Sequence, residues 1–224
     1  MLMPVKFKRF RKEYRGRAFT LLDVGCGNHS PTVTKRYFPA SRYHGLDHAV
    51  YNNDDADLAA MEMFYEIDLE TGDLTEVPDG FFDVILFVHV IEHLSNGLEV
   101  LSRLSGKLKP GGKLYAEFPS IASLGLPSAE GTLHFCDDPT HVKLYGLREV
   151  ANVLLESDMT ILKAGRRRDT PRFFLYPLVV IRNLLRRLRG RKIHSKGMWD
   201  FHGFADFVYA ERKSHHPRPP ARVT

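Results

Sequence analysis

The stretch that decides the fold is residues 19–27, which read FTLLDVGCG. An apolar run over residues 19–24 ends directly in Gly25 and Gly27, and Pro31 opens a helical stretch that extends to about Phe38. This order predicts a buried strand, a tight turn and a helix. Such a turn lets the backbone approach a ligand closely, and the helix start favours negative charge. The same glycines would equally serve tight packing of the strand against the helix.

Strands alternate with helices outward from this turn. The apolar patterns predict strands over residues 43–46, 64–67, 82–90, 113–118, 159–163 and 201–209. They predict helices over residues 52–63, 91–108 and 147–157. This alternation is typical of an α/β fold with a doubly wound, mostly parallel sheet, in which ligands bind beyond the carboxyl ends of the strands. The turns that carry Gly or Asp all follow a predicted strand, so we expect them to line one crevice.

The charge is divided unevenly along the 224 residues, whose net charge is +5. Residues 1–17 hold seven Lys or Arg and one Glu, and residues 163–196 hold twelve and one Asp. Residues 18–162 hold nine basic and 22 acidic residues. We therefore expect a basic N-terminal arm (1–17), a domain (18–211) that is acidic over residues 18–162 and carries a basic amphipathic insertion (166–196), and a disordered Pro-containing tail (212–224).

The cysteines and the apolar runs indicate the compartment. Cys26 and Cys136 are far apart, which favours neither a disulfide framework nor a metal knuckle. No apolar run is long enough to span a bilayer, and the N-terminus does not resemble a secretion signal. We expect a cytoplasmic protein.

Three motifs in order resemble those of the class I S-adenosylmethionine-dependent methyltransferases, including bacterial small-molecule, glycan and lipid methyltransferases. They are residues 21–27 (LLDVGCG), residues 82–85 (FDVI) with Glu92-His93-Leu94, and residues 108–112 (LKPGG). The resemblance covers about residues 18–165 and 200–211. It implies a Rossmann-like seven-stranded sheet with an antiparallel last strand, and S-adenosylmethionine as the cofactor.

The resemblance also assigns cofactor contacts. Asp47 would accept the ribose hydroxyls and Asp68 the adenine amine, because these donors of the cofactor need acceptors. Asp23 would orient the glycine turn of Gly25, Cys26 and Gly27 and the methionine end, and His89 would lie beside the cofactor. Helix capping is an alternative role for Asp47 and for Asp68.

The catalytic candidates lie after the fifth predicted strand, in residues 134–142 (HFCDDPTHV). This stretch resembles the Asp-Pro-Thr-His loop of many bacterial methyltransferases. His141 is our candidate general base, with Asp138 or Asp137 as its partner and His89 nearby. A capped turn with His141 packed beneath it is the structural alternative.

A metal site is a further hypothesis. His89, Glu92 and His93 resemble a Glu-x-x-Glu-His arrangement that binds a divalent ion in some methyltransferases, and His141 or His134 could supply another ligand. A histidine stands here in place of the first glutamate, and Glu-His also occurs in methyltransferases without metal, so we expect a metal-free enzyme.

The basic insertion predicts an amphipathic helix from Leu178 onward, with Arg182, Arg186 and Arg189 on a different face from the leucines. Residues 173–192 could contact an anionic membrane from the cytoplasmic side, form a lid over the substrate, or hold RNA phosphates.

The sequence therefore predicts methyl transfer to a small-molecule, glycan or lipid-linked acceptor, most simply at oxygen. The alternatives are an RNA methyltransferase that uses its basic segments, a cofactor-binding interaction protein without turnover, and a nicotinamide oxidoreductase.

Overall fold

The computed structural model describes residues 3–169 and 174–214. Phe173, which begins the segment that could contact a membrane, and most of the expected disordered tail lie outside the described residues.

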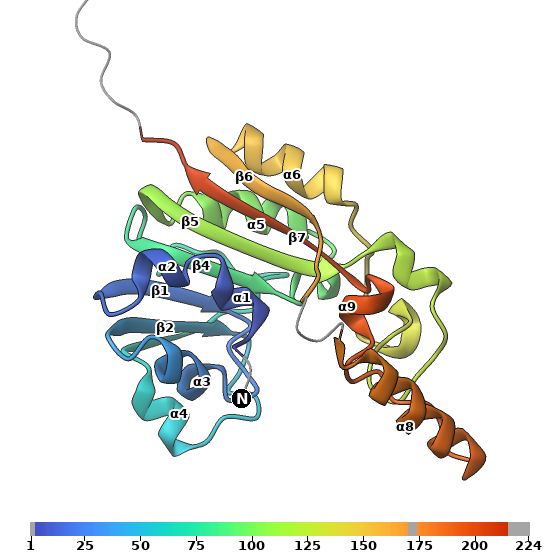
Figure 1. Cartoon of the computed structure of the whole chain (residues 1–224). Helices are drawn as coiled ribbons and strands as arrows, with labels where there is room; N and C mark the ends of the chain where they lie inside the picture. The colour runs from blue at the N-terminus through green and yellow to red at the C-terminus, as the bar shows by residue number, and fades with distance from the viewer. Residues whose placement is uncertain (1–2, 170–173, 215–224) are drawn as a thin grey trace, which may run out of the picture.

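Seven strands form one sheet in the order β3-β2-β1-β4-β5-β7-β6 (Figure 1). The strands are β1 (Phe19–Val24), β2 (Ser41–Asp47), β3 (Met63–Glu66), β4 (Phe82–Val88), β5 (Leu108–Pro119), β6 (Met159–Arg166) and β7 (Ala205–Arg212). Strand β7 runs antiparallel to β5 and β6, and the other pairings are parallel. The expected doubly wound sheet with an antiparallel last strand is confirmed.

The central strands form where the sequence can be buried on both faces of the sheet. All six residues of β1 are buried, and so are the four central residues of β4, its neighbour. Such continuous apolar runs are typical of parallel strands covered on both sides.

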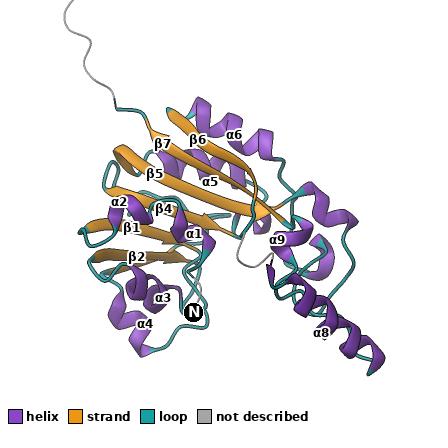
Figure 2. Ribbon diagram, in the orientation of Figure 1, coloured by secondary structure: helices purple, strands orange, loops and turns teal. Residues whose placement is uncertain are grey.

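Helices cover both faces of the sheet (Figure 2). The helices are α1 (Val5–Lys8), α2 (Arg11–Tyr14), α3 (Ser30–Tyr37), α4 (Asp55–Ala60), α5 (Gly97–Ser105), α6 (Leu147–Glu156), α8 (Tyr176–Leu188) and α9 (Trp199–His202), and short 3-10 turns are η1 (Ile91–His93), η2 (Ile121–Gly125) and η3 (Phe135–Asp137). One apolar cluster joins α5 and α6 to the sheet, and a second joins the N-terminal helices and the end of α3 to it.

The basic N-terminal segment, which we expect to be an arm, packs on the sheet instead. Phe7 and Phe10 are fully buried, and the Phe10 ring stacks on Phe38 with centroids 5.2 Å apart. Lys8 reaches Asp169 at 2.6 Å. The buried side chains of Phe7 and Phe10, three positions apart, therefore fix this segment to the body, although its net charge is strongly positive.

Several expected elements have different bounds in the structure, and two of these differences have a clear local cause. The helix expected over residues 91–108 is divided, because Leu94 is extended and the Asn96 amide donates to Leu69 O, 3.0 Å away. Leu108 begins β5 rather than ending this helix. The last strand begins at Ala205 and not at Phe201, which lies in α9, a turn of helix ended by Gly203 at φ 70°.

The segment between β6 and β7 carries α8, which projects beyond the end of the sheet (Figure 1). A small apolar cluster that includes Leu133, Met198 and Phe204 joins this segment to the loop after β5. In the part of the chain that the structure describes, no helix is both long and apolar enough to cross a membrane.

Candidate functional site

The turn after β1 has a conformation that requires glycine. Gly25 has φ 75°, and a Cβ atom there would lie 2.3 Å from Val90 Cγ2. A Cβ on Gly27 would lie 2.8 Å from the carbonyl oxygen of Tyr51. The turn thus lies against the segment after β2 with no room for a side chain, and it leads directly into α3.

Asp23 and Cys26 lie beneath this turn, away from the surface of the cavity described below. One carboxylate oxygen of Asp23 accepts hydrogen bonds from Ser30 Oγ at 2.5 Å and from the Tyr43 hydroxyl at 2.9 Å. Lys6 Nζ lies 3.4 Å from the same oxygen. Burial raises the pKa of the Cys26 thiol to about 12, with the nearby Asp23 charge adding to this effect. Both side chains therefore shape the turn from below.

The turn forms one wall of a cavity of about 600 Å³ at the edge where the parallel strands end. Its lining comprises Gly25, Gly27, Asn28, Leu46, Asp47, His48, Tyr51, Ile67, Asp68, Leu69, Glu70, His89, Val90, His93, Leu94, Asp138 and Thr140. The cavity therefore joins the glycine turn, the ends of three neighbouring strands and the loop after η3.

The two aspartates expected to contact the cofactor both line this cavity. Asp47 ends β2, and one of its carboxylate oxygens accepts a hydrogen bond from the His48 N–H at 2.9 Å. Asp68 follows β3, and its two oxygens accept hydrogen bonds from Glu70 N–H at 2.9 Å and Thr71 Oγ1 at 3.0 Å. Asp68 thus caps a turn and not a helix, which was its expected alternative role, while it also lines the cavity.

His89 lies on the cavity wall between two buried carboxylates. It follows β4 with φ 56°, and its Nδ1 is 2.9 Å from Glu92 Oε1 while its Nε2 is 3.2 Å from Glu117 Oε1. Burial alone would lower the pKa of His89, but these hydrogen bonds and charges outweigh it and raise the pKa to about 9. Both ring nitrogens are engaged by carboxylates, so His89 has no nitrogen available to receive a further proton.

A buried ion-pair network extends from His89 toward the C-terminal segment. Arg167 Nε lies 3.1 Å from Glu117 Oε1, and its guanidinium is 3.7 Å from Asp200 in α9. Burial of Glu117 would raise the pKa of its carboxyl, but Arg167 and His89 hold that pKa below its usual value. Arg167 therefore connects the end of β6, β5 and α9 to the cavity wall.

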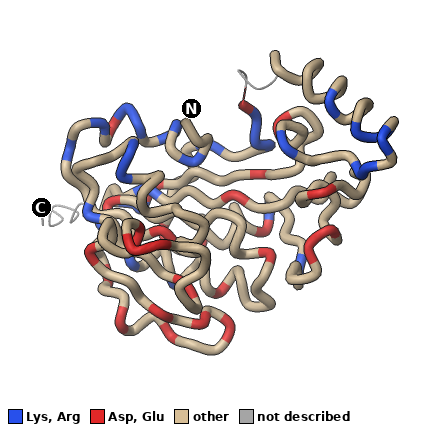
Figure 3. Tube along the Cα trace, turned by 90° about the horizontal axis from the view of Figure 1, so that it is seen from below, with Lys and Arg blue, Asp and Glu red and all other residues tan. Residues whose placement is uncertain are grey.

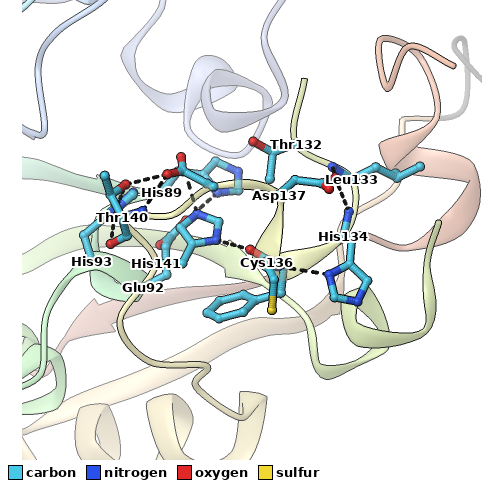
Figure 4. Close-up of polar contacts among 12 residues, drawn as sticks. His89, Glu92, His93, Thr132, Leu133, His134, Cys136, Asp137, Thr140 and His141 are labelled. Carbon is cyan, nitrogen blue, oxygen red and sulfur yellow. Dashed lines mark hydrogen bonds and ion pairs between the residues drawn. The ribbon is translucent and has the colours of Figure 1, made fainter. Parts of the chain in front are cut away.

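Two further histidines lie at this side of the cavity, His93 in η1 and His141 in the loop after η3 (Figure 4). His93 lines the cavity, and its Nδ1 lies 3.1 Å from Thr140 O. His141 lies behind it with 5 % of its side chain exposed, and the two rings have centroids 5.0 Å apart. His141 Nδ1 lies 2.6 Å from Phe135 O. A carbonyl only accepts, so Nδ1 of each ring carries the proton and each Nε2 is left as an acceptor when the ring is neutral.

Asp138, and not Asp137, is the acid beside His141. The distance from Asp138 Oδ2 to His141 Nε2 is 3.9 Å, and Asp138 also accepts a hydrogen bond from Thr140 Oγ1 at 2.6 Å. Asp137 turns the other way and accepts hydrogen bonds from the backbone N–H groups of Leu133 and His134. Asp137 is thus a capping residue of η3.

Three of the four expected metal ligands converge. One ligand atom from each of Glu92, His93 and His141 lies within 4.8 Å of the others. Glu92 Oε2 is buried and has no hydrogen-bond partner among the described residues. His89 is outside this group because its ring is held by the two carboxylates. His134 also lies apart, since its Nδ1 accepts from Cys136 N–H.

Sequence reasoning missed Glu117 and Arg167. A glutamate inside the otherwise apolar run of residues 113–118 was the available signal, because a buried charge needs a partner. The hydroxyl of Tyr115, two residues earlier, donates to Glu117 at 2.6 Å. Its charged partners Arg167 and His89 follow β6 and β4, and no local pattern indicates them.

The comparisons with known proteins agree with this arrangement. A family model described as a methyltransferase domain matches residues 5–164. A search of the curated proteins finds no match.

Solved structures share the fold at low sequence identity. A SAM-dependent methyltransferase from Archaeoglobus fulgidus is 18 % identical with a TM-score of 0.57, covering 92 % of this chain and 91 % of that one. One from Mesorhizobium loti is 16 % identical with a TM-score of 0.59, covering 91 % and 95 %. The 1,6-didemethyltoxoflavin-N1-methyltransferase of Burkholderia thailandensis, solved with S-adenosylhomocysteine, is 13 % identical with a TM-score of 0.54, covering 94 % and 79 %.

The family match covers most of the chain, and the sheet order and the glycine turn agree with it. The chain belongs to the methyltransferase-domain family and is a class I S-adenosylmethionine-dependent methyltransferase.

Proposed function

We propose that this enzyme transfers a methyl group to the oxygen of a small-molecule, glycan or lipid-linked acceptor, in the cytoplasm. The observation that carries this proposal is the single cavity in which the glycine turn, Asp47 and Asp68 face His93 and Asp138. One wall offers a place for a nucleoside-containing cofactor, and the other offers groups that can accept a proton.

The cofactor wall fits S-adenosylmethionine. The backbone of Gly25 and Gly27 lines the cavity, and a Cβ at either position would collide with Val90 or Tyr51. Asp47 and Asp68 both line the cavity, and we assign the carboxylate of Asp47 to the ribose hydroxyls and that of Asp68 to the adenine amine. Asp23 and Cys26 support the turn from beneath. When bound, the cofactor supplies an electrophilic methyl group for in-line displacement, so positioning of the acceptor and exclusion of water provide much of the rate.

A hydroxyl acceptor must lose its proton, and His141 is the proposed general base. Its Nδ1–H donates to Phe135 O, which leaves Nε2 beside Asp138 and His93. His93 lies between His141 and the cavity, so we include it in the proton path. His89 we assign to positioning, because both its nitrogens are held by Glu92 and Glu117.

A divalent cation on Glu92, His93 and His141 is the second candidate for activating the acceptor. The buried, unpartnered Glu92 Oε2 favours it, because such an oxygen is costly without a hydrogen bond or an ion. A cation there would lower the pKa of a bound hydroxyl.

A screen of phenols, glycans and lipid-linked sugars for release of S-adenosylhomocysteine tests the proposed acceptor class. We expect turnover with a hydroxylated acceptor, and we expect His141→Ala to abolish it with cofactor affinity almost unchanged. Transfer only to nitrogen or to RNA would overturn the proposal. Loss of both turnover and affinity in His141→Ala would show a structural role instead.

The cation is tested without any acceptor. Calorimetric titration with Mn²⁺ or Zn²⁺ alone should show one site in the wild type and none in Glu92→Gln, with His134→Ala as the matched control that retains it. Absence of cation binding by the wild type would leave His141 as an unassisted base.

A further inference from the structure

Helix α8 is attached to the protein by its polar side. Asn183 is buried, and its amide exchanges two hydrogen bonds with the backbone of His194, at 3.0 and 3.1 Å. Arg182 donates to Lys196 O at 2.7 Å and Arg186 donates to Lys192 O at 2.9 Å. These side chains lie three and four residues apart, so they form one face of the helix.

The opposite face of α8 is apolar and exposed. Its exposed fractions are 64 % for Leu178, 55 % for Ile181, 57 % for Leu184 and 76 % for Leu188, and Phe174 just before the helix is 80 % exposed. We call these five side chains the apolar face of α8. Among the described residues that line the cavity with the glycine turn, none belongs to α8. The apolar face therefore does not cover that cavity as a lid. An amphipathic helix at a protein surface normally turns its apolar face to the protein and its polar face to water, which is the reverse of what α8 does.

Basic side chains surround the apolar face. At roughly 100° per residue, Arg187 and Arg189 fall on its two flanks, and both are exposed. Long basic side chains beside an apolar stripe can extend to lipid headgroups while the stripe enters the acyl region.

The same side of the molecule carries a wider basic surface. Figure 3 shows Lys and Arg of the N-terminal segment, of residues near the end of β6 and of α8 along one side, and most Asp and Glu on the other. A second cavity of about 600 Å³ is lined by Lys8, Arg9, Lys163, Arg166 and Arg168, together with Asp169, which pairs with Lys8. This concave basic surface is complementary to phosphate groups.

We propose that the apolar face of α8 and the basic side around it dock on an anionic phospholipid membrane. Lipid is favoured over RNA because five exposed apolar side chains add nothing to the binding of a phosphate backbone, whereas an interfacial helix requires them. Docking goes beyond the proposed methyl transfer and does not depend on it.

Vesicle flotation tests the docking surface. Wild-type protein should float with vesicles of phosphatidylglycerol and phosphatidylcholine in equal amounts and much less with phosphatidylcholine alone. Ile181→Ser with Leu188→Ser should weaken the partition more than ten-fold. Arg187→Gln with Arg189→Gln should weaken it about five-fold for each charge removed.

The matched control is Leu155→Ser with Leu162→Ser, which removes two side chains that are 50 % and 45 % exposed but lie on α6 and β6. It should float like the wild type. Unchanged binding of S-adenosylhomocysteine by all variants shows that the fold is intact and separates failure of docking from failure of the proposed function. Equal flotation of wild type and Ile181→Ser/Leu188→Ser would overturn the proposal. So would binding of an RNA hairpin that depends on Arg187 and Arg189 without any vesicle binding.

Discussion

Replacement of Arg167 by Met should strongly destabilise the fold. The Arg167 side chain is 9 % exposed, and its partners Glu117 and Asp200 are 5 % and 2 % exposed. Met keeps much of the apolar stem but removes the guanidinium, so Glu117 and Asp200 both lose their ion pair with Arg167, while Glu117 keeps His89 and the Tyr115 hydroxyl. Removal of one member of a buried ion pair typically costs roughly 3–5 kcal/mol, because the remaining charge stays desolvated. We expect the free energy of unfolding to fall by about this amount.

Urea unfolding measures the effect, and two further variants make it specific. Arg42→Met removes an exposed ion pair with Glu62, whose side chains are 53 % and 43 % exposed, and should cost less than about 1 kcal/mol. Arg167→Met with Glu117→Gln should be less destabilised than the sum of the two single variants, because the double variant leaves no buried charge on Glu117. A cost for Arg167→Met similar to that for Arg42→Met would refute the argument that this network is desolvated.

Three other variants test the glycine turn, the acid dependence of the protein's stability and the packing of the core. Gly25→Ala should lower the free energy of unfolding by well over 1 kcal/mol and weaken cofactor binding. Gly80→Ala, at φ 60° with no atom within 4 Å of its Cβ, should show the cost of backbone strain alone. Urea unfolding measures the stability of both variants, and calorimetry measures their cofactor binding. Burial would raise the pKa of Asp57, but hydrogen bonds, the largest of them from Thr32, lower it from 3.8 to about 2. About 2 kcal/mol of stability should therefore be present above pH 4 and lost as the pH falls through 2. Equal acid sensitivity of Asp57→Asn and the wild type would contradict this. Leu101→Ala, at a fully buried position in α5, should lower the free energy of unfolding by roughly 2–5 kcal/mol in the same urea assay.

The central strands could be predicted from the sequence because burial on both faces leaves a continuous apolar run. The predicted strand over residues 19–24 has the bounds of β1, and β4 ends two residues before the predicted limit. The errors occur where apolar spacing continues across a break. The leucines of residues 91–108 keep helical spacing, but Asn96 and Gly97 make contacts with distant residues that divide the helix.

The site was only partly predictable, because contacts between residues that are distant in the sequence also shape it. Glycines and aspartates at strand ends meet because parallel strands share an edge, and Gly25, Asp47 and Asp68 do so. The approach of His93 to His141 depends on how the loop after β5 returns to β4, which no local spacing determines. Helical spacing likewise indicated that α8 is amphipathic, but hydrogen bonds from Arg182 and Asn183 decide which face meets the protein.

Calorimetric titration of the purified protein with S-adenosylhomocysteine and, separately, with NAD⁺ tests the central claim most directly. We predict binding of S-adenosylhomocysteine and none of NAD⁺. Asp47→Ala should weaken the binding at least ten-fold through lost charge-assisted hydrogen bonds. Asp79→Ala, which removes an exposed aspartate that pairs with Lys107, should not weaken it. Failure of the wild type to bind S-adenosylhomocysteine would contradict the account of the cavity as the methyl-donor site.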